Sequence, residues 1–151
     1  MHTEINAAVG IVRTVARPDW SWDASELATN CRELTWSAPS RSDASTRVAT
    51  NLRINRPEAF VHIEDGAVWE MMVWVSDIEE PDYRGPSPAV SGFEAILARI
   101  IVEFGEPSQD LFDEVWGYRW DLSNTVAFLI AREDGIFLDL VNPEVQKKWD
   151  A

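Results

Sequence analysis

The stretch that decides the fold is AFVHIEDGAVWEMMVWVS, residues 59–76. The Asp65-Gly66 pair separates two runs rich in valine, isoleucine and aromatic residues. Such a pair favours a tight hairpin, because both central residues of that turn need positive φ. The second run is apolar on both sides except at Glu70, a pattern that predicts a central strand covered on both faces. We therefore expect two antiparallel strands, over 59–64 and 67–76, inside a larger sheet.

Similar strand patterns lie on both sides of this hairpin. A second Asp-Gly pair at 134–135 predicts another hairpin between the last two runs. The further strands are predicted over residues 33–37, 48–55, 115–122, 125–132 and 136–141.

Helix signals complete the pattern. Thr3 is a candidate cap for a first helix, and Asp23 begins a second with Glu26 three residues on, as in a capping box. Ser91 and Glu94 form another capping box before the longest apolar face, which ends at Phe104 before a Gly105 C-cap. The sequence thus predicts a single α+β domain over residues 1–151, with an antiparallel sheet of about six to seven strands, one long helix packed on it and two N-terminal helices.

Composition and charge restrict the function. The chain has 151 residues, 46% of them hydrophobic, with 8 tryptophans and a formal net charge of −13. That charge excludes nucleic-acid binding through a basic patch and disfavours an anionic membrane surface, whereas it attracts a basic protein partner. The sequence leaves the oligomeric state open.

The lone cysteine and the histidines limit the chemistry. Cys31 has no cysteine to pair with inside the chain, which fits a reducing, cytoplasmic setting. His2 and His62 are too few for a zinc site, and His62 is expected to be a cross-strand histidine. No nucleophile elbow or phosphate-binding loop occurs. We therefore expect no catalytic residue, no metal and no cofactor.

Acidic loops next to aromatic residues are the best candidates for a functional surface. The first loop covers 77–82 and the second 110–114, and neither has the spacing of a calcium loop. Tryptophan and tyrosine in strands are ordinarily core residues, but they are interface hot spots where they reach the surface. The expected partner-binding residues are Asp77, Glu79, Glu80, Asp82, Tyr83, Asp110, Asp113, Glu114, Trp116 and Tyr118.

Several short motifs resemble an uncharacterised actinobacterial family of small domains. They span most of the chain and are structural rather than catalytic, so the resemblance implies no functional residue. They are Trp20-Ser21-Trp22-Asp23, Leu34-Thr35-Trp36, the run 50–57, Asp65-Gly66-Ala67-Val68, Val75-Ser76-Asp77, Phe104-Gly105-Glu106-Pro107, the tryptophan-bearing strand that ends at Trp120, and the run 135–143.

In charge and organisation the chain also resembles the small acidic immunity proteins encoded beside secreted bacterial toxins. That resemblance implies a cytoplasmic inhibitor that places carboxylates and aromatic rings across a basic active-site cleft. A non-catalytic adaptor or chaperone of a secretion system is the alternative, and a small-molecule-binding domain is a third.

Overall fold

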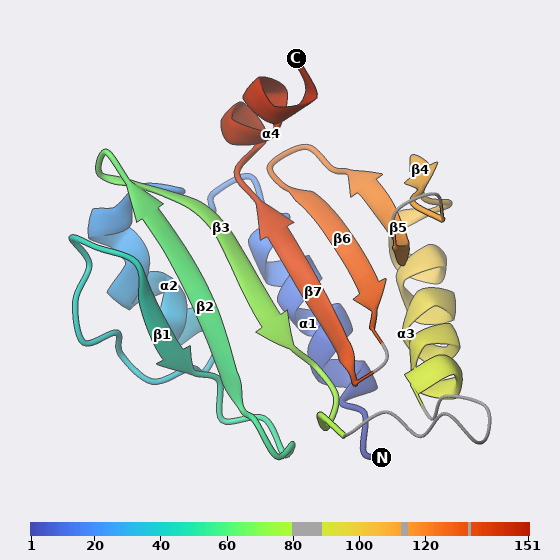
Figure 1. The fold of residues 1–151 in the computed structure, drawn as a ribbon. Coiled ribbons are helices and arrows are strands. Elements are labelled where there is room, and N and C mark those ends of the chain that lie inside the picture. The colour runs from blue at the N-terminus through green and yellow to red at the C-terminus, as the bar shows by residue number, and fades with distance from the viewer. Residues whose placement is uncertain (80–88, 113–114, 133) are drawn as a thin grey trace.

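A computed structural model describes residues 1–79, 89–112, 115–132 and 134–151 (Figure 1). All the strands in these ranges belong to one antiparallel sheet of seven strands, in the order β1-β2-β3-β7-β6-β5-β4. The elements in chain order are α1 (Ile5–Val15), the 3-10 turn η1 (Ala24–Glu26), α2 (Leu27–Glu33), β1 (Thr46–Ala49), β2 (Glu58–Glu64), β3 (Ala67–Trp74), α3 (Ala89–Phe104), β4 (Gln109–Asp110), β5 (Trp116–Asp121), β6 (Val126–Ala131), β7 (Ile136–Val141) and α4 (Pro143–Asp150).

The sheet has two unlike faces. Helices α1 and α2 lie behind the sheet in Figure 1, and α3 is seen beside its β5 edge. Helix α3 contacts β6 and β7, and α1 packs against both α3 and β7. We call this side the helix face and the opposite side the open face. Helix α4 follows β7 and covers one end of the open face, where Val145 packs with Val126 and Val141. The rest of the open face has no helix of the described chain over it.

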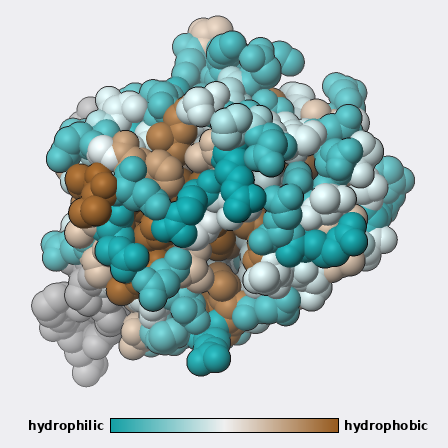
Figure 2. Space-filling model, turned by 180° about the vertical axis from the view of Figure 1, so that it is seen from behind, coloured by the Kyte–Doolittle hydropathy of each residue, from teal (hydrophilic) through white to brown (hydrophobic). Residues whose placement is uncertain are grey.

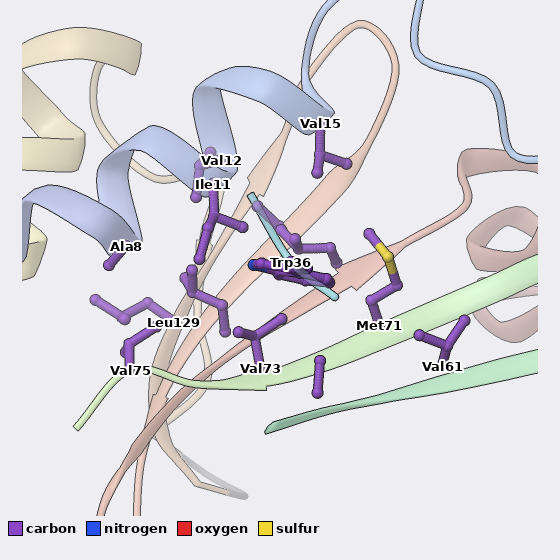
Figure 3. Packing of buried hydrophobic residues seen from close by; sticks show 14 of the residues in the cluster. Ala8, Ile11, Val12, Val15, Trp36, Val61, Met71, Val73, Val75 and Leu129 are labelled. Atoms are coloured by element: carbon purple, nitrogen blue, oxygen red, sulfur yellow. The ribbon is translucent and has the colours of Figure 1, made fainter. Parts of the chain in front are cut away.

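The hydrophobic core fills the space between the helix face and α1 and α3. Alternate strand residues point into it, among them Val73, Leu129 and Leu138, which are fully buried. Figure 3 shows Ala8 and Val12 of α1 above this layer. Burying each such side chain contributes about 1.5–3 kcal/mol relative to exposure. The surface on the helix side is mainly hydrophilic, with separated apolar patches (Figure 2).

The hairpin predicted at Asp65-Gly66 is confirmed. Asp65 has φ 52° and Gly66 has φ 74°, as a type I′ turn requires. Strand β3 lies inside the sheet, between β2 and β7. Its open face is only half-buried, however, and the strand buried on both faces is β7.

The other Asp-Gly pair lies between β6 and β7, but its glycine has a different role from Gly66. The hairpin is present, but among the glycines of the described ranges only Gly66 and Gly105 have positive φ. A Cβ on Gly135 would lie 3.1 Å from the backbone oxygen of Asp77 and 3.2 Å from the Trp74 ring. A larger residue here would force the Asp77 backbone or the Trp74 ring to shift by a few tenths of an ångström, so close packing favours glycine at this position.

The strand predicted over 33–37 is wrong. Helix α2 runs to Glu33, and Thr35, with φ 60°, reverses the chain. The Thr35 amide donates to the Arg32 carbonyl and the Trp36 amide to the Cys31 carbonyl, which is a Schellman motif. Trp36 then enters the core, where it is buried.

The helix set also differs from the prediction of one long and two N-terminal helices, because the described chain has four α-helices. The missed one, α4, is capped by Asn142, whose side chain accepts a hydrogen bond from the Glu144 amide, with Pro143 in the first turn. The first helix begins after Glu4 rather than Thr3, since Thr3 bridges to Ser76. The second acidic loop begins at Asp110, the last residue of the short strand β4, and the strand predicted over 48–55 is the shorter β1.

Candidate functional site

The described part of the first acidic loop, residues 77–79, forms structural contacts with other segments of the chain. The Asp77 carboxylate accepts hydrogen bonds from the backbone amides of His2 and Asn55, each at 2.9 Å. The bond from His2, followed by the bond from Asn55, lowers the pKa of Asp77 despite some desolvation. Glu79 lies 3.5 Å from the N-terminal amine. Asp77 is thus an anchor for two segments, while the Glu79 side chain remains half-exposed.

Five of the expected binding residues fall outside the described ranges. They are Glu80, Asp82, Tyr83, Asp113 and Glu114.

The three aromatic residues of β5 share the helix face. Trp116 and Tyr118 have ring centroids 6.0 Å and 6.1 Å from that of Phe93 on α3. Trp120 is 2% exposed, and its indole N–H donates to the Gly105 carbonyl at 3.0 Å. Trp120 therefore belongs to the core, Tyr118 is half-buried, and Trp116 reaches the surface.

Trp116 is part of an exposed apolar cluster at the sheet edge. Phe112 is 54% exposed, Val115 37% and Trp116 46%. The Phe112 ring packs edge-to-face on Tyr118 at 5.2 Å, which ties the cluster to the core. Asp110, on the edge strand β4, is exposed beside it. We call Asp110, Phe112, Val115 and Trp116 the edge cluster.

The strand register places the edge cluster and the first acidic loop at the same end of the sheet. Trp116 pairs with Ala131, Ala131 pairs with Ile136, and the Val75 amide donates to the Ile136 carbonyl. Val75 and Trp116 therefore lie in one row, three strand spacings or about 14 Å apart. Asp77 and Glu79 follow Val75 directly, so acids and exposed rings share this end.

A second cluster of titratable side chains lies on the open face, and the sequence predicted only the position of its histidine. His62 pairs across the strands with Glu70, as a cross-strand histidine should; its Nδ1 lies 3.7 Å from the Glu70 carboxylate and its Nε2 3.2 Å from that of Glu64. Asp139 on β7 was missed. The only signal for it was one acid inside the apolar run Ile136–Val141.

Asp139 is the most perturbed carboxyl group of this set. Burial raises its pKa well above the ordinary range, and the charge of Glu70 and a hydrogen bond with that residue raise it further. Its Oδ1 is buried, without a hydrogen-bond partner in the described chain. We therefore expect Asp139 to hold its proton at neutral pH.

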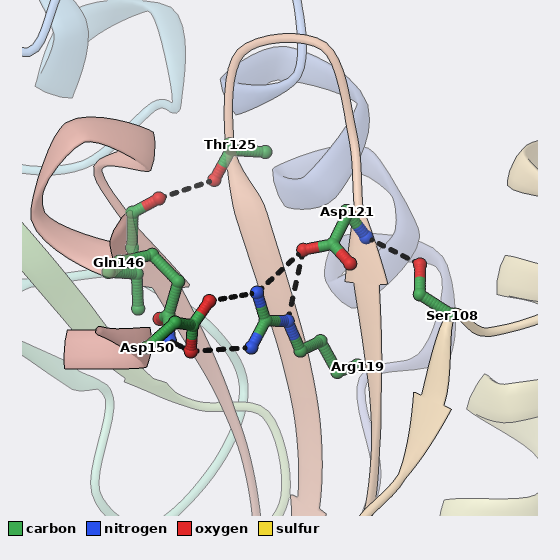
Figure 4. A network of polar contacts seen from close by, with 7 residues as sticks. Ser108, Arg119, Asp121, Thr125, Gln146 and Asp150 are labelled. Atoms are coloured by element: carbon green, nitrogen blue, oxygen red, sulfur yellow. Dashed lines mark hydrogen bonds and ion pairs between the residues drawn. The ribbon is translucent and has the colours of Figure 1, made fainter. Parts of the chain in front are cut away.

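A network around Arg119 attaches α4 to the sheet (Figure 4). The guanidinium group donates two hydrogen bonds to Asp150, at 3.0 and 2.7 Å, and one to Asp121 at 3.0 Å. The bonds from Arg119 and Gln146 lower the pKa of Asp150 to about 2. This bidentate pair is structural, since it holds the last turn of the chain against β5.

Two negative observations apply to the described part of the chain. In it, no three His, Cys, Asp or Glu side chains are arranged to hold a metal ion. None of its helices has the length and apolar character needed to cross a membrane.

The architecture defines an α+β domain in which three helices cover one face of an antiparallel sheet. The chain belongs to the family of unknown function DUF6301, whose model matches residues 6–142. No curated protein and no solved structure matches it.

Proposed function

We propose that this protein is an immunity protein that binds a secreted toxin domain and blocks it without chemistry of its own. The observation that carries the proposal is the edge cluster, where exposed aromatic side chains lie beside acids. Of the seven large hydrophobic side chains that are exposed in the described chain, three lie within residues 112–116. Such a concentration is typical of a binding surface rather than of scattered surface apolar residues.

The aromatic rings of the edge cluster and the acids at this end of the sheet have separate roles in binding. Phe112 and Trp116 offer rigid rings of the kind that dominate interface energies. Asp110 and Glu79, in a chain of net charge −13, favour a partner whose contact surface is basic and speed its association. A toxin whose active-site cleft is lined by lysine and arginine would present that surface.

The lone thiol supports a cytoplasmic setting for this complex. Cys31 is buried, and desolvation raises its pKa to about 11, so the thiol is inert and stays protonated. The bias of the basic residues toward arginine, with lysine only at 147 and 148, supports an actinobacterial source.

The test is co-expression with the product of the neighbouring gene in a bacterial host, with growth as the readout. We expect the native chain to rescue growth and the double variant Phe112→Ala/Trp116→Ala to fail. The loss of two hot-spot rings should weaken binding by about 2 kcal/mol or more, which is at least about thirtyfold.

Trp149→Ala is the matched control, because Trp149 is 47% exposed but lies on α4, against Trp69 of the open face. Circular dichroism would verify that all variants fold. Full rescue by the double variant would remove the edge cluster from the interface. A neighbouring product that binds but has no toxic activity would favour the adaptor or chaperone alternative.

A further inference from the structure

The uncovered part of the open face contains a pocket that the proposed function does not use. The register places Arg47, Phe60 and Met72 in one row across β1, β2 and β3. In the adjacent row, Trp74 on β3 pairs with Phe137 on β7. These side chains, together with Arg56, Glu58 and Arg132, line a cavity of about 170 Å³. We call it the arginine pocket.

Three arginines meet there from three separate segments. Arg47 lies on β1, Arg56 precedes β2, and Arg132 follows β6. Arg13, Arg17, Arg41 and Arg119 each form an ion pair with a carboxylate. In contrast, none of the three pocket arginines is paired with a carboxylate of the described residues.

The concentration of positive charge is unusual in this chain. Three of its 13 basic residues line one small cavity although acids outnumber bases two to one. Glu58 is the one acid among the described lining residues, which together carry an excess of positive charge. Arginines that have no counterion among the described residues and meet in a concave site attract an anion, and the fork of each guanidinium group suits the oxygens of a phosphate or carboxylate.

The floor of the pocket is aromatic. The Trp74 ring packs edge-to-face on Phe137, with centroids 5.5 Å apart, and the Arg132 guanidinium lies over the Phe137 ring at 5.1 Å. Phe60 is 42% exposed at the wall. A flat ring that enters here would be in contact with aromatic faces and with a guanidinium plane.

We propose that the arginine pocket binds a small planar ring that carries an anionic group, an aryl phosphate or aryl carboxylate. The ring rests on Phe60 and Trp74, and the anion is held by Arg47, Arg56 and Arg132. The size agrees with one ring, since a cavity of about 150 Å³ accepts benzene. Glu58 favours a ring with a hydrogen-bond donor and disfavours a second anionic group.

The test uses phenyl phosphate as the probe and follows the backbone and indole N–H signals by NMR. Trp74→Phe identifies the Trp74 indole signal. We expect that signal to shift with phenyl phosphate at millimolar concentration or below. Benzoate, the carboxylate counterpart, distinguishes the two anions. Inorganic phosphate tests the anion alone and phenol the ring alone, and both should bind at least tenfold more weakly than the combined probe.

The variants Arg132→Gln and Arg47→Gln should each weaken binding of the tighter aryl anion about tenfold, because each removes a charge-assisted contact. Arg99→Gln is the matched control. Arg99 is also exposed, but its guanidinium donates to Asn6 on the helix side of the sheet. It should leave the affinity unchanged.

The inference is overturned if neither aryl anion shifts the Trp74 signal. It is also overturned if both pocket variants bind as tightly as Arg99→Gln, or if phenol or inorganic phosphate binds as well as the tighter of the two aryl anions. Because the side chains changed are exposed, all three variants should keep the native spectrum outside the pocket. The result is independent of the toxin rescue, since none of these residues belongs to the edge cluster.

Discussion

Replacing Asp139 with asparagine should stabilise the fold at neutral pH and remove part of its pH dependence. In the folded state Asp139 keeps a proton, because burial and the neighbouring Glu70 raise its pKa. In the unfolded chain an ordinary aspartate releases that proton above about pH 4. Folding at neutral pH therefore takes up a proton, and each pH unit above 4 lowers the free energy of unfolding by as much as about 1.4 kcal/mol.

The side chain of asparagine reproduces the protonated acid. Its amide group donates to Glu70 without any proton uptake, and its size is the same. At pH 5 the Asp139→Asn variant should be about 1 kcal/mol more stable than the native chain. Between pH 5 and pH 7 this advantage should grow by about 3 kcal/mol at most, since two pH units at about 1.4 kcal/mol set the upper limit.

Urea unfolding monitored by tryptophan fluorescence at pH 5, 6 and 7 measures the effect. Glu70→Gln is the matched variant, because it also removes one carboxyl group of the pair. Glu70→Gln leaves the buried Asp139 carboxyl group in place, so it should keep most of the pH dependence, and the double variant should gain little beyond Asp139→Asn alone. A constant difference between Asp139→Asn and the native chain over this pH range would refute the reasoning, for it would mean that Asp139 is ionised in the folded protein.

Three further predictions concern the fold. Gly117→Ala should destabilise the protein by about 2 kcal/mol or more in urea unfolding, because the new Cβ would lie 2.6 Å from the Leu129 backbone oxygen, closer than real Cβ atoms come. Gly66→Ala should cost about 1 kcal/mol in thermal unfolding, because Gly66 has φ 74° in the β2–β3 turn, whereas Gly10→Ala, in a helix with open space around it, should be neutral or stabilising. Arg119→Met should raise the pKa of Asp150 from about 2 toward its ordinary value near 4 in a carboxyl NMR titration, although the remaining bond from Gln146 should keep it somewhat below that value. Because this pKa is lowered in the folded state, the stability it contributes is present above pH 4 and is lost as the pH falls toward 2. An unchanged Asp150 titration would show that Arg119 does not hold it.

Local signals predicted most of the sheet because they are carried by neighbouring residues. The Asp65-Gly66 turn and the end of α3 at Gly105 both need a left-handed backbone conformation. Glycine and aspartate favour this conformation, so the sequence predicted both features. The end of α2 needs the same conformation, but it is supplied by Thr35, a β-branched residue that rarely adopts it. Because the apolar residues Leu34 and Trp36 alternate with polar neighbours, this segment resembled a strand in the sequence. The sequence does contain a start signal for α4, an Asn142 cap followed by a proline. This signal was missed because the residues after it form a short, charged segment.

The open face was not predictable in the same way, because it depends on register between strands far apart in the chain. Glu70 and Asp139 are 69 positions apart in the sequence, and their contact arises from the β3–β7 pairing. The register of β2 on β3 also shifts at His62 and Ile63, which places Trp69 beside His62. Nothing in either strand alone reports this shift. The arginine pocket likewise draws on three segments whose proximity only the assembled sheet defines.

The buried Asp139 lies next to the arginine pocket, and this position suggests a reason why an acid rather than an apolar residue occupies it. Asp139 extends the row of Arg47, Phe60 and Met72 by one strand, so an ionised Asp139 would offset part of the positive charge that the pocket offers an anion. The proton it holds leaves that charge in place. A sheet selected for stability alone would carry an apolar residue here, as most of β7 does. Asp139→Asn separates the two effects: it should raise stability at pH 7 and leave phenyl phosphate binding unchanged, because both side chains are neutral there. If the variant lost binding instead, the Asp139 carboxyl group would have to contact the ligand directly, and the pocket would extend one strand further across the open face.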